Sequence, residues 1–505
     1  MARNLAFVLI ALLGVAPFAS ATASTQLAPE AELRGSGVGG ANYTRVCNQI
    51  AGFISTGSRV YYPGDDAFDK LSKHWSPSSS EVSTCVVEPK TASDVGRILK
   101  IVGLSRTPFA VQSGGHSTNP GFSSTKGIHI SLNNFNTVQY DATSKTAEFG
   151  AGLRWDDVYA ALEPHGVSVL GGRVAGVGVG GFTLGGGYAW RTNQYGLTID
   201  TATAFELVKP NGDVLKVTEK LDPSLFFALR GGGNNFGVVT KITLRAYPQG
   251  QVWGGMITYG IPDTFSAVAN ATAKFSAEVK DPKAGMMSTV TVYQGMQFIN
   301  VQVFYDGPAP PAGIFDDLLS ITAVNSDVAT RSWLELVKSI PTDFLGTSRG
   351  AFLGVSVPEY SYNFLELVNN ITFTTGAELT PKSLSFMTLV SEPFLPSILS
   401  HSRSPAAYPY TRSKVYTPFN IFMAWTDPSQ DKVMYDSMRK VKDILETALV
   451  AEGHRDVKSA PLYSNYALGD TPISRIYGSN YPALKAIKTR VDPFNVMGLA
   501  GGFKI

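Results

Sequence analysis

A histidine that follows two glycines is the first candidate for chemistry in this sequence. It is His116, within the run Gln112–Ser117, directly after a strand predicted over residues 107–112. Consecutive glycines let backbone N–H groups turn toward an anion, as a diphosphate requires, and the imidazole stands at the end of that turn. Taken alone, however, a histidine in a glycine turn is more often an ordinary polar turn residue.

A second glycine-rich stretch, Gly171–Tyr188, favours a phosphate-bearing ligand. Its segment Gly176–Gly181 has the spacing G-x-G-x-x-G, which is a dinucleotide fingerprint only where it opens a helix. Gly185–Gly187 follows within four residues, and each glycine would cost a helix ~1 kcal/mol. We therefore expect a long loop around an extended cofactor and no helix start at this motif. A third cluster, Gly231–Gly237, is by itself a plain strand connector.

The elements that must position these motifs alternate between strands and helices. Thr91–Val102 is a predicted helix, because Thr91-x-x-Asp94 fits a capping box and one apolar stripe follows, with Gly103 as its end. Asn211-Gly212 between two apolar runs predicts a hairpin. Further strands are expected at 127–132, 137–141, 146–150, 205–208, 214–217 and 238–246, and a helix at 154–163.

After about residue 249 the pattern changes to long aromatic strands and amphipathic helices. Phe298–Tyr305 and Phe419–Trp425 are predicted strands, and residues 429–452 form the clearest helix, which Gly453 caps. Its predicted buried face consists of Val433, Val441, Ile444, Leu445, Ala448 and Leu449. We expect a second α+β domain here, an antiparallel sheet covered by helices on one side.

Length and composition limit the function classes. A chain of 505 residues exceeds one hydrophobic core, so at least two domains are expected. A net charge of +2 gives no reason to expect nucleic acid as a partner, and six scattered histidines without metal-ligand spacing give none to expect a metal. No segment after the N-terminal run is apolar enough for a membrane span, and nothing demands more than a monomer.

The N-terminus predicts export. Residues 1–23 have a basic start, a short apolar run and two A-x-A cleavage options, which is typical of a signal peptide, and a flexible lead-in follows at 24–41. The alternative, a membrane anchor, needs a run of ~20 apolar residues. Cys47 and Cys85 are the only cysteines, and an oxidising compartment favours a disulfide between them over two buried thiols. The glycosylation sequons are Asn42, Asn270 and Asn370.

Together the motifs resemble the berberine bridge enzyme-like FAD-linked oxidases of the vanillyl-alcohol oxidase superfamily, over most of the chain. The resemblance implies a fold of class α+β, a two-domain PCMH-type FAD-binding fold of two α+β subdomains plus a substrate domain. We expect the FAD-binding domain at 42–248, the substrate domain at 249–460 and a returning C-terminal segment at 461–505. The matching segments are Gln112–Ser117, Gly176–Gly187, Asn193–Gly196 with Asp200, Leu229–Leu244, Tyr463–Tyr466, Tyr477–Pro482 and Asp492–Asn495.

The resemblance implies a covalent bond from His116 to the C8-methyl group of the flavin. Where many members have a cysteine for a second bond, this chain has Val174, so a single covalent bond is expected. Val177 occupies the position that governs oxygen access, where a small β-branched residue goes with oxidase behaviour. The implied cofactor-binding residues are Ser113, Gly114, Gly115, Ser117, Val174, Val177, Gly178, Gly181, Gly186, Gly187, Tyr188, Tyr195, Gly196, Val239, Tyr463 and Asn465.

For catalysis the resemblance points to Tyr466, with Tyr463 beside it. A free phenol has a pKa near 10, so a tyrosine base needs cations or hydrogen bonds that stabilise the phenolate. Without the resemblance, two tyrosines at this spacing are more often core packing. An assisting group is expected from the substrate domain, and the sequence leaves it open among Glu392, Tyr408, Tyr410 and Tyr416.

The expected activity is that of a secreted FAD oxidase that takes hydride from an alcohol, an amine or another C–H donor and reduces O2 to H2O2. A flavin dehydrogenase with poor O2 reactivity and a non-catalytic secreted flavin-binding protein are the alternatives. Oligosaccharides and secondary metabolites both suit an exported enzyme of this kind, and no spacing rule in the sequence chooses between them.

Overall fold

The computed structural model describes residues 43–340, 342 and 348–505. The predicted signal peptide, the lead-in and the Asn42 sequon lie outside these residues. The first sheet has four strands in the order β1-β2-β4-β3, with β1 antiparallel and the other pairs parallel. Helices α2 and α4 bury their apolar sides in the same core as these strands. The bounds are β1 (Arg59–Tyr61), β2 (Cys85–Glu88), β3 (Phe109–Gln112), β4 (Ile128–Ser131), α2 (Thr44–Phe53), α3 (Asp66–Ser72) and α4 (Ala92–Ser105).

Helix α4 begins where the capping box predicts, and it ends later than predicted. The Oγ1 of Thr91 accepts a hydrogen bond from the backbone N–H of Asp94 at 3.1 Å, so the predicted N-cap is confirmed. Gly103 lies inside the helix, and the prediction that it ends the helix was wrong. A Cβ on Gly103 would lie 2.9 Å from a methyl group of Val496, so the glycine serves close packing against the C-terminal segment.

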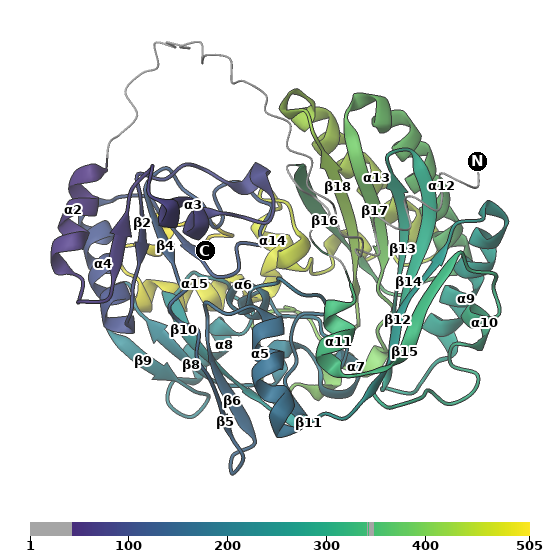
Figure 1. Cartoon of the computed structure of the whole chain (residues 1–505), viewed down its shortest axis with the longest axis horizontal. Helices are drawn as coiled ribbons and strands as arrows, with labels where there is room; N and C mark the ends of the chain where they lie inside the picture. Colours follow the sequence, from purple (N-terminus) through teal and green to yellow (C-terminus); the bar gives the residue numbers. More distant parts are fainter. Residues whose placement is uncertain (1–42, 341, 343–347) are drawn as a thin grey trace, which may run out of the picture. The chain divides into compact units, whose positions relative to one another are not determined.

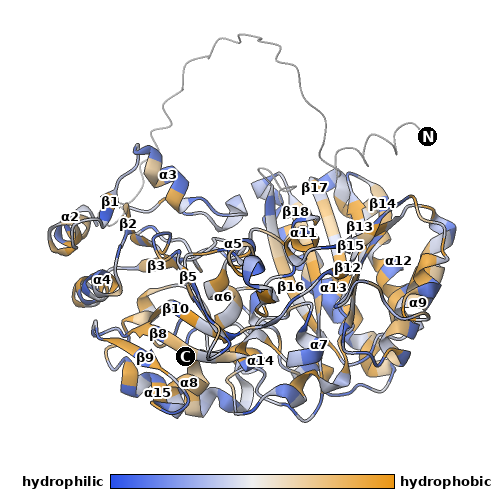
Figure 2. Cartoon of the chain, turned by 60° about the horizontal axis from the view of Figure 1, so that its bottom comes forward, coloured by the Kyte–Doolittle hydropathy of each residue, from blue (hydrophilic) through white to orange (hydrophobic). Residues whose placement is uncertain are grey.

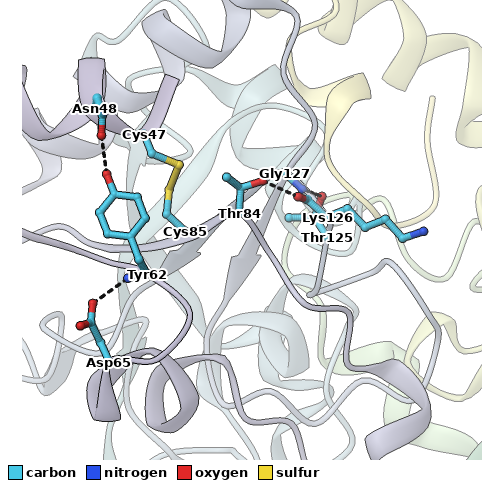
Figure 3. Close-up of a disulfide and its surroundings, with 9 residues drawn as sticks. All are labelled: Cys47, Asn48, Tyr62, Asp65, Thr84, Cys85, Thr125, Lys126 and Gly127. Carbon is cyan, nitrogen blue, oxygen red and sulfur yellow. Dashed lines mark hydrogen bonds between the residues drawn. A yellow bond between two sulfur atoms is a disulfide. The ribbon is translucent and has the colours of Figure 1, made fainter. Parts of the chain in front are cut away.

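Cys47 and Cys85 form a disulfide, as predicted, and it joins α2 to the start of β2 (Figure 3). Both cysteines are fully buried. Next to them, the hydroxyl of Tyr62 donates a hydrogen bond of 2.7 Å to Asn48 of α2, so a side-chain contact supports the same connection. The disulfide therefore fixes α2 on the sheet that carries the glycine turn.

The second sheet has five antiparallel strands in the order β5-β6-β10-β8-β9. The Asn-Gly hairpin prediction is confirmed, because β8 and β9 pair from Val208 opposite Val214. The C-terminal helix α15 buries Leu484 and Ile487 in the core of this sheet. The bounds are β5 (Val138–Asp141), β6 (Thr146–Gly150), β8 (Ala202–Val208), β9 (Val214–Val217), β10 (Val238–Arg245), α5 (Trp155–Leu162), α8 (Pro223–Leu229), α14 (Ile473–Ile476) and α15 (Tyr481–Val491).

The third large sheet has seven antiparallel strands in the order β15-β12-β14-β13-β17-β18-β16. Helices α9, α12 and α13 pack on one face of it (Figure 1), as the sequence predicts. The bounds are β12 (Val252–Tyr259), β13 (Ala284–Tyr293), β14 (Met296–Tyr305), β15 (Asn325–Arg331), β16 (Arg349–Val357), β17 (Leu384–Ser391), β18 (Thr417–Trp425), α9 (Phe265–Glu278), α12 (Tyr362–Leu379) and α13 (Asp431–Ala451).

The covering helices are amphipathic, and Figure 2 shows both hydrophobic and hydrophilic colours along α9 and α12. In α13 the buried residues include Met434, Met438 and Leu445. Ile444, predicted on the buried face, is 39 % exposed, so that prediction was wrong. The reason is that two methionines rotate the buried stripe away from Ile444 and leave it beside the polar face.

The seven-stranded sheet has two different faces because side chains alternate along each strand. On β16, Ala351, Leu353 and Val355 enter the core under the helices. Phe352 and Gly354 therefore point to the opposite face, where Gly354 lies against Tyr466 of the C-terminal segment. That opposite face is the one on which the polar site residues gather.

The remaining elements are short: β7 (Val167–Ser168), β11 (Tyr247–Pro248), α6 (Val179–Leu184), α7 (Thr192–Tyr195), α10 (Asp316–Leu319) and α11 (Trp333–Lys338). Within the described residues no helix is both long and apolar enough to cross a membrane. Asn270 and Asn370 are exposed on α9 and α12, and their glycosylation stays a prediction.

Candidate functional site

The two glycine motifs lie back to back. A Cβ on Gly114 would lie 2.5 Å from both the Cα and the N of Gly178, and the reverse substitution would meet Gly114 equally closely. Ser113 ties the two segments together, because its hydroxyl donates to the carbonyl of Ala151 at 2.6 Å and accepts from the N–H of Gly180 at 3.1 Å. Only glycine lets two backbones approach this closely, so both motifs serve one site.

The fingerprint Gly176–Gly181 does open a helix, which corrects the expectation of an uninterrupted loop. Helix α6 starts at Val179 and runs for only six residues. It stops at Gly185–Gly187, of which Gly186 and Gly187 have φ of +127° and +80°. The cost of three glycines thus ends the helix at that point, and it does not prevent the helix from starting. Gly181 is exposed, with open space where its Cβ would be.

His116 stacks on an aromatic ring that sequence reasoning missed. The indole of Trp75 lies parallel to the imidazole, with 4.3 Å between ring centroids and an interplanar angle of 13°. The Nε2 of His116 is buried and has no hydrogen-bond partner within the described residues. Burial lowers the pKa of His116 to about 4, so the imidazole is neutral near pH 7 and carries a nucleophilic nitrogen.

Arg173, Glu392 and Tyr466 form a buried polar triad. The guanidinium of Arg173 makes an ion pair of 2.6 Å with Glu392 and donates a hydrogen bond of 3.1 Å to the hydroxyl of Tyr466. The hydroxyl of Tyr466 in turn donates to the carboxylate of Glu392 at 2.9 Å. Arg173 comes from the second glycine stretch, Glu392 follows β17 and Tyr466 lies in the C-terminal segment, so three distant parts of the chain meet.

The pKa values in this triad do not favour Tyr466 as a base by itself. Burial, and next the charge of Glu392, raise the pKa of Tyr466 well above 10, although Arg173 opposes the shift. The expected cation is therefore present, but it does not produce a stable phenolate. Burial also raises the pKa of Glu392 above 4.5, against the lowering effect of Arg173, which makes its carboxylate a stronger base.

Tyr463 and Asn465 lie beside the triad and hold the glycine-rich stretch. The amide of Asn465 donates to the hydroxyl of Tyr463 at 2.9 Å and to the carbonyl of Phe182 at 3.1 Å. The ring of Tyr463 meets that of Tyr466 edge-on at 5.0 Å. Burial raises the pKa of Tyr463 to about 12.

A tyrosine pair lies against the glycines that follow α6. A Cβ on Gly186 would lie 2.8 Å from the ring of Tyr408. The hydroxyl of Tyr408 forms a hydrogen bond of 3.1 Å with the hydroxyl of Tyr188.

A row of aromatic rings connects the histidine with the triad. Trp75, stacked on His116, also stacks on Phe352 of β16 with 5.8 Å between centroids. Phe352 in turn stacks on Tyr466 at 6.0 Å. The glycine turn and the triad are therefore parts of one site. One side of this site is formed by the face of the seven-stranded sheet on which the helices do not pack.

The remaining predicted cofactor-binding residues make other contacts. Tyr195 stacks on Tyr247 at 3.8 Å under Arg191, and Gly196 packs against Asp200. Val239 is buried in the core of the five-stranded sheet, the core against which Val174 and Val177 also pack. Ser117 is half-buried in the turn after His116. Roles for these residues at the cofactor stay predictions.

Among the four assisting candidates only Glu392 contacts Tyr466. The hydroxyl of Tyr410 donates to the carbonyl of Ser459, and that of Tyr416 to Asp456. Tyr408 packs against the ring of Tyr463 and not against Tyr466 itself.

Sequence reasoning missed two site residues, Arg173 and Trp75. Arg173 stood inside a glycine-rich stretch, and a lone charge in such an apolar context was a signal that could have found it.

These residues fit a flavin dinucleotide. The buried, unpartnered Nε2 of His116 is the kind of group that a covalent ligand would satisfy, and the paired glycine backbones leave N–H groups near the turn without side chains in the way. His116, Ser113, Gly114 and Gly115 are the residues that would hold such a group. No cluster of three or more metal-ligating side chains exists within the described part of the chain.

Gly114→Ala tests the contact between the two glycine motifs. The added methyl group would overlap the backbone of Gly178, so we expect the variant to lose ~1–3 kcal/mol in free energy of unfolding. Urea denaturation followed by circular dichroism measures this loss. Gly52→Ala on the exposed side of α2 is the control, because nothing lies within 4 Å of its Cβ position and its stability should not fall. Equal stability of the two variants would contradict the close contact.

Arg173→Met tests the ion pair. It leaves the buried carboxylate of Glu392 without its cation, so we expect a loss of ~3–5 kcal/mol in free energy of unfolding near neutral pH. The pKa of Glu392 then rises further, so the loss is largest above that pKa and shrinks as the pH falls and the group is protonated. Thermal denaturation at several pH values measures this trend. Adding Glu392→Gln should restore most of the stability, and a deficit that is independent of pH would argue against the pair.

Two family models match this chain, one for an FAD binding domain over residues 83–218 and one described as berberine and berberine like over residues 462–500. The first contains the glycine turn and the second glycine stretch, and the second contains Tyr463, Asn465 and Tyr466. The two matches together contain His116, Arg173 and Tyr466, whereas Glu392 and Trp75 lie outside both matched ranges.

Among curated relatives, the chain is 30 % identical over 478 residues to the FAD-dependent monooxygenase drtC of Aspergillus calidoustus, covering 89 % of this chain and 88 % of the relative. Among solved structures, a carbohydrate oxidase from Microdochium nivale superposes with a TM-score of 0.74 at 16 % identity, covering 90 % and 98 % of the two chains. The 6-hydroxy-D-nicotine oxidase of Arthrobacter nicotinovorans gives a TM-score of 0.71 at 22 % identity, covering 88 % and 96 %. These two structures share the fold, which is the PCMH type predicted from the sequence.

Proposed function

The chain belongs to the berberine bridge enzyme-like family of FAD-dependent oxidoreductases, and we propose that it is a secreted oxidase that holds FAD by a single covalent bond to His116. The observation that carries the proposal is the triad of Arg173, Glu392 and Tyr466, joined to His116 by the aromatic row. It combines a proton acceptor with an attachment point for the cofactor in one site.

The attachment to His116 is supported by the state of its imidazole. The ring is neutral, its Nε2 is unpartnered, and Trp75 fixes the plane of the ring. A second covalent bond to the cofactor lacks a candidate, because Val174 occupies the corresponding position and both cysteines are in the disulfide. Acid precipitation of the purified protein and the colour of its pellet test the covalent bond.

Proton transfer is the part of the reaction that this chain performs. A flavin bound there would supply the two-electron oxidation of the donor, with O2 as the final electron acceptor. The hydroxyl of Tyr466 takes the donor's proton as its own proton moves along the hydrogen bond of 2.9 Å to Glu392. Arg173, 3.1 Å from that hydroxyl, stabilises the negative charge while it is shared between the two oxygens.

The assignment of O2 as acceptor is supported by Val177, a β-branched residue at the oxygen-access position that the family resemblance implies. The relative named above is a monooxygenase, and a monooxygenase also consumes O2. Peroxide formation separates these reactions: an oxidase forms one H2O2 for each donor oxidised, a monooxygenase forms an oxygenated product, and a dehydrogenase reduces a dye faster than it reduces O2. A peroxide-coupled screen over sugars, alcohols and amines tests the proposal.

Export is supported by the apolar N-terminal run and by the disulfide between Cys47 and Cys85, which persists in an oxidising compartment. Expression of the full-length chain, followed by N-terminal sequencing of the protein in the medium, tests export and the cleavage site together.

A further inference from the structure

A buried polar pair that the proposed reaction does not use lies directly before the glycine turn. It consists of Gln112, the last residue of β3, and His129, on the neighbouring strand β4. Their exposed fractions are 6 % and 0 %. The Nε2 of His129 lies 2.6 Å from the Oε1 of Gln112, and the Nε2 of Gln112 donates a hydrogen bond of 2.7 Å to the backbone carbonyl of Lys73. Burying such groups is costly unless they are paired, so the pair needs an explanation.

The direction of each hydrogen bond follows from the backbone carbonyl at one end of the network. A carbonyl oxygen only accepts, so Lys73 fixes the amide of Gln112 with its oxygen toward His129. His129 must then donate from Nε2. Burial, and next the imidazole of His74, lower the pKa of His129 to about 3, so this ring is neutral near pH 7. The network therefore has a single arrangement of donors and acceptors.

Gln112 also determines the shape of the glycine turn. Gly115 has φ of +66°, and a Cβ there would lie 2.4 Å from the Nε2 of Gln112. Only glycine can therefore lie over this amide. The carbonyl of Gly115 accepts a hydrogen bond of 2.9 Å from the backbone N–H of Trp75. Residues 73–75 are thus held to the turn by two hydrogen bonds, one to the side chain of Gln112 and one to Gly115.

Residues 73–75 carry the aromatic ring that lies on the attachment residue. The indole of Trp75 stacks on the imidazole of His116, with 4.3 Å between ring centroids and 13° between the planes. The backbone on both sides of this stack is held through Gln112, because His116 follows Gly115 directly and Trp75 follows Lys73 by two residues. Gln112 therefore acts on the plane of His116 through its neighbours.

We propose that Gln112 is the positioning residue for the covalent attachment of flavin to His116, and that His129 holds Gln112 in place. The inference rests on the proposed function. Attachment joins the Nε2 of His116 to the methyl carbon at C8 of the flavin. One C–H bond of that methyl group and the N–H bond of the imidazole break, and O2 takes up the electron pair and both protons as H2O2. The nitrogen must point at the methyl carbon, and a misplacement of ~1 Å can slow such a step about 100-fold.

Gln112→Met tests the inference, because methionine has a similar length and forms neither hydrogen bond. The full-length protein is purified at several times after a short pulse of expression and kept with excess FAD. Flavin fluorescence of the acid-precipitated protein then gives the covalent fraction at each time. We expect covalent incorporation to be about 10- to 100-fold slower in the variant. Reversible binding of FAD should persist, since the contact between Gly114 and Gly178 is unchanged.

Two further variants separate positioning from a general loss of stability. His129→Leu removes the donor to Gln112 but leaves the hydrogen bond to Lys73, so its attachment should be slowed less than that of Gln112→Met. Gln194→Met is the matched control, because it removes a half-buried glutamine amide that donates to Asp306 at 2.8 Å. It should attach flavin at the wild-type rate. Melting temperatures show which variants are folded.

A wild-type rate of attachment in folded Gln112→Met would overturn the inference, and so would equal slowing in Gln194→Met. If Gln112→Met does not fold, the same judgement passes to His129→Leu, whose attachment at the wild-type rate would overturn it. These results leave the proposed function intact, because they are measured against a wild-type protein that attaches flavin. The proposed function fails separately, if the wild-type protein gains no acid-stable flavin at any time.

Discussion

Tyr466→Phe is expected to lower kcat by about 100- to 10,000-fold, which is the range that a positioned acid–base group contributes. Phenylalanine keeps the ring contacts with Phe352 and Tyr463 but removes the hydroxyl that connects the donor with Glu392. Stopped-flow measurement of flavin bleaching without oxygen isolates this step from reoxidation. Flavin content should be unchanged, because the cofactor is attached on another part of the chain.

Glu392→Gln belongs to the same prediction. In the wild type, activity should fall as the pH drops through the raised pKa of Glu392, since only the carboxylate accepts the proton. The variant should be slow at every pH and should lack this acidic limb. Tyr416→Phe is the control, because Tyr416 was an equally eligible candidate in the sequence and bonds to Asp456 instead. If Tyr466→Phe retains more than about a tenth of wild-type kcat, the relay is wrong.

His116→Ala is expected to release all the flavin into the supernatant on acid precipitation, whereas the wild-type pellet stays yellow. The variant should still bind FAD reversibly through the paired glycine segments, because its substitution leaves the contact of Gly114 with Gly178 intact. Flavin fluorescence of pellet and supernatant gives the ratio, and the melting temperature shows that the protein is folded.

His165→Ala is the control for this experiment, since His165 is exposed and contacts only the ring of Tyr140 among the aromatic residues described. Its flavin should remain in the pellet. Flavin that stays with the pellet of folded His116→Ala would show that another residue holds the cofactor.

Much of the architecture could be predicted from local sequence patterns. The capping box at Thr91, the Asn211-Gly212 hairpin and the strand alternation at 298–305 each reflect interactions within a few residues, and the structure confirms them. Gly103 was misjudged for a different reason. The partner of Gly103 is Val496, almost four hundred residues away in sequence, and no local pattern contains that contact.

The candidate site shows the same difference between local motifs, which the sequence displays, and long-range contacts, which it does not. The glycine turn with His116 and the tyrosine pair are contiguous motifs, so they could be found in the sequence. Glu392 could be named only as one of four residues, because its contact with Tyr466 depends on where β17 ends relative to the C-terminal segment. Arg173 is marked in the sequence only as a lone charge in a glycine-rich stretch, and its partners Glu392 and Tyr466 become evident only in the folded chain.

The most direct test of the central claim is the mass of one tryptic peptide from the purified protein. Cleavage after Arg106 and Lys126 gives residues 107–126, which contain His116 as their only histidine. We expect this peptide to carry the added mass of FAD, with the modification on the imidazole, and no other peptide to carry it. An unmodified 107–126 peptide from yellow, active protein would contradict the covalent attachment on which the account rests.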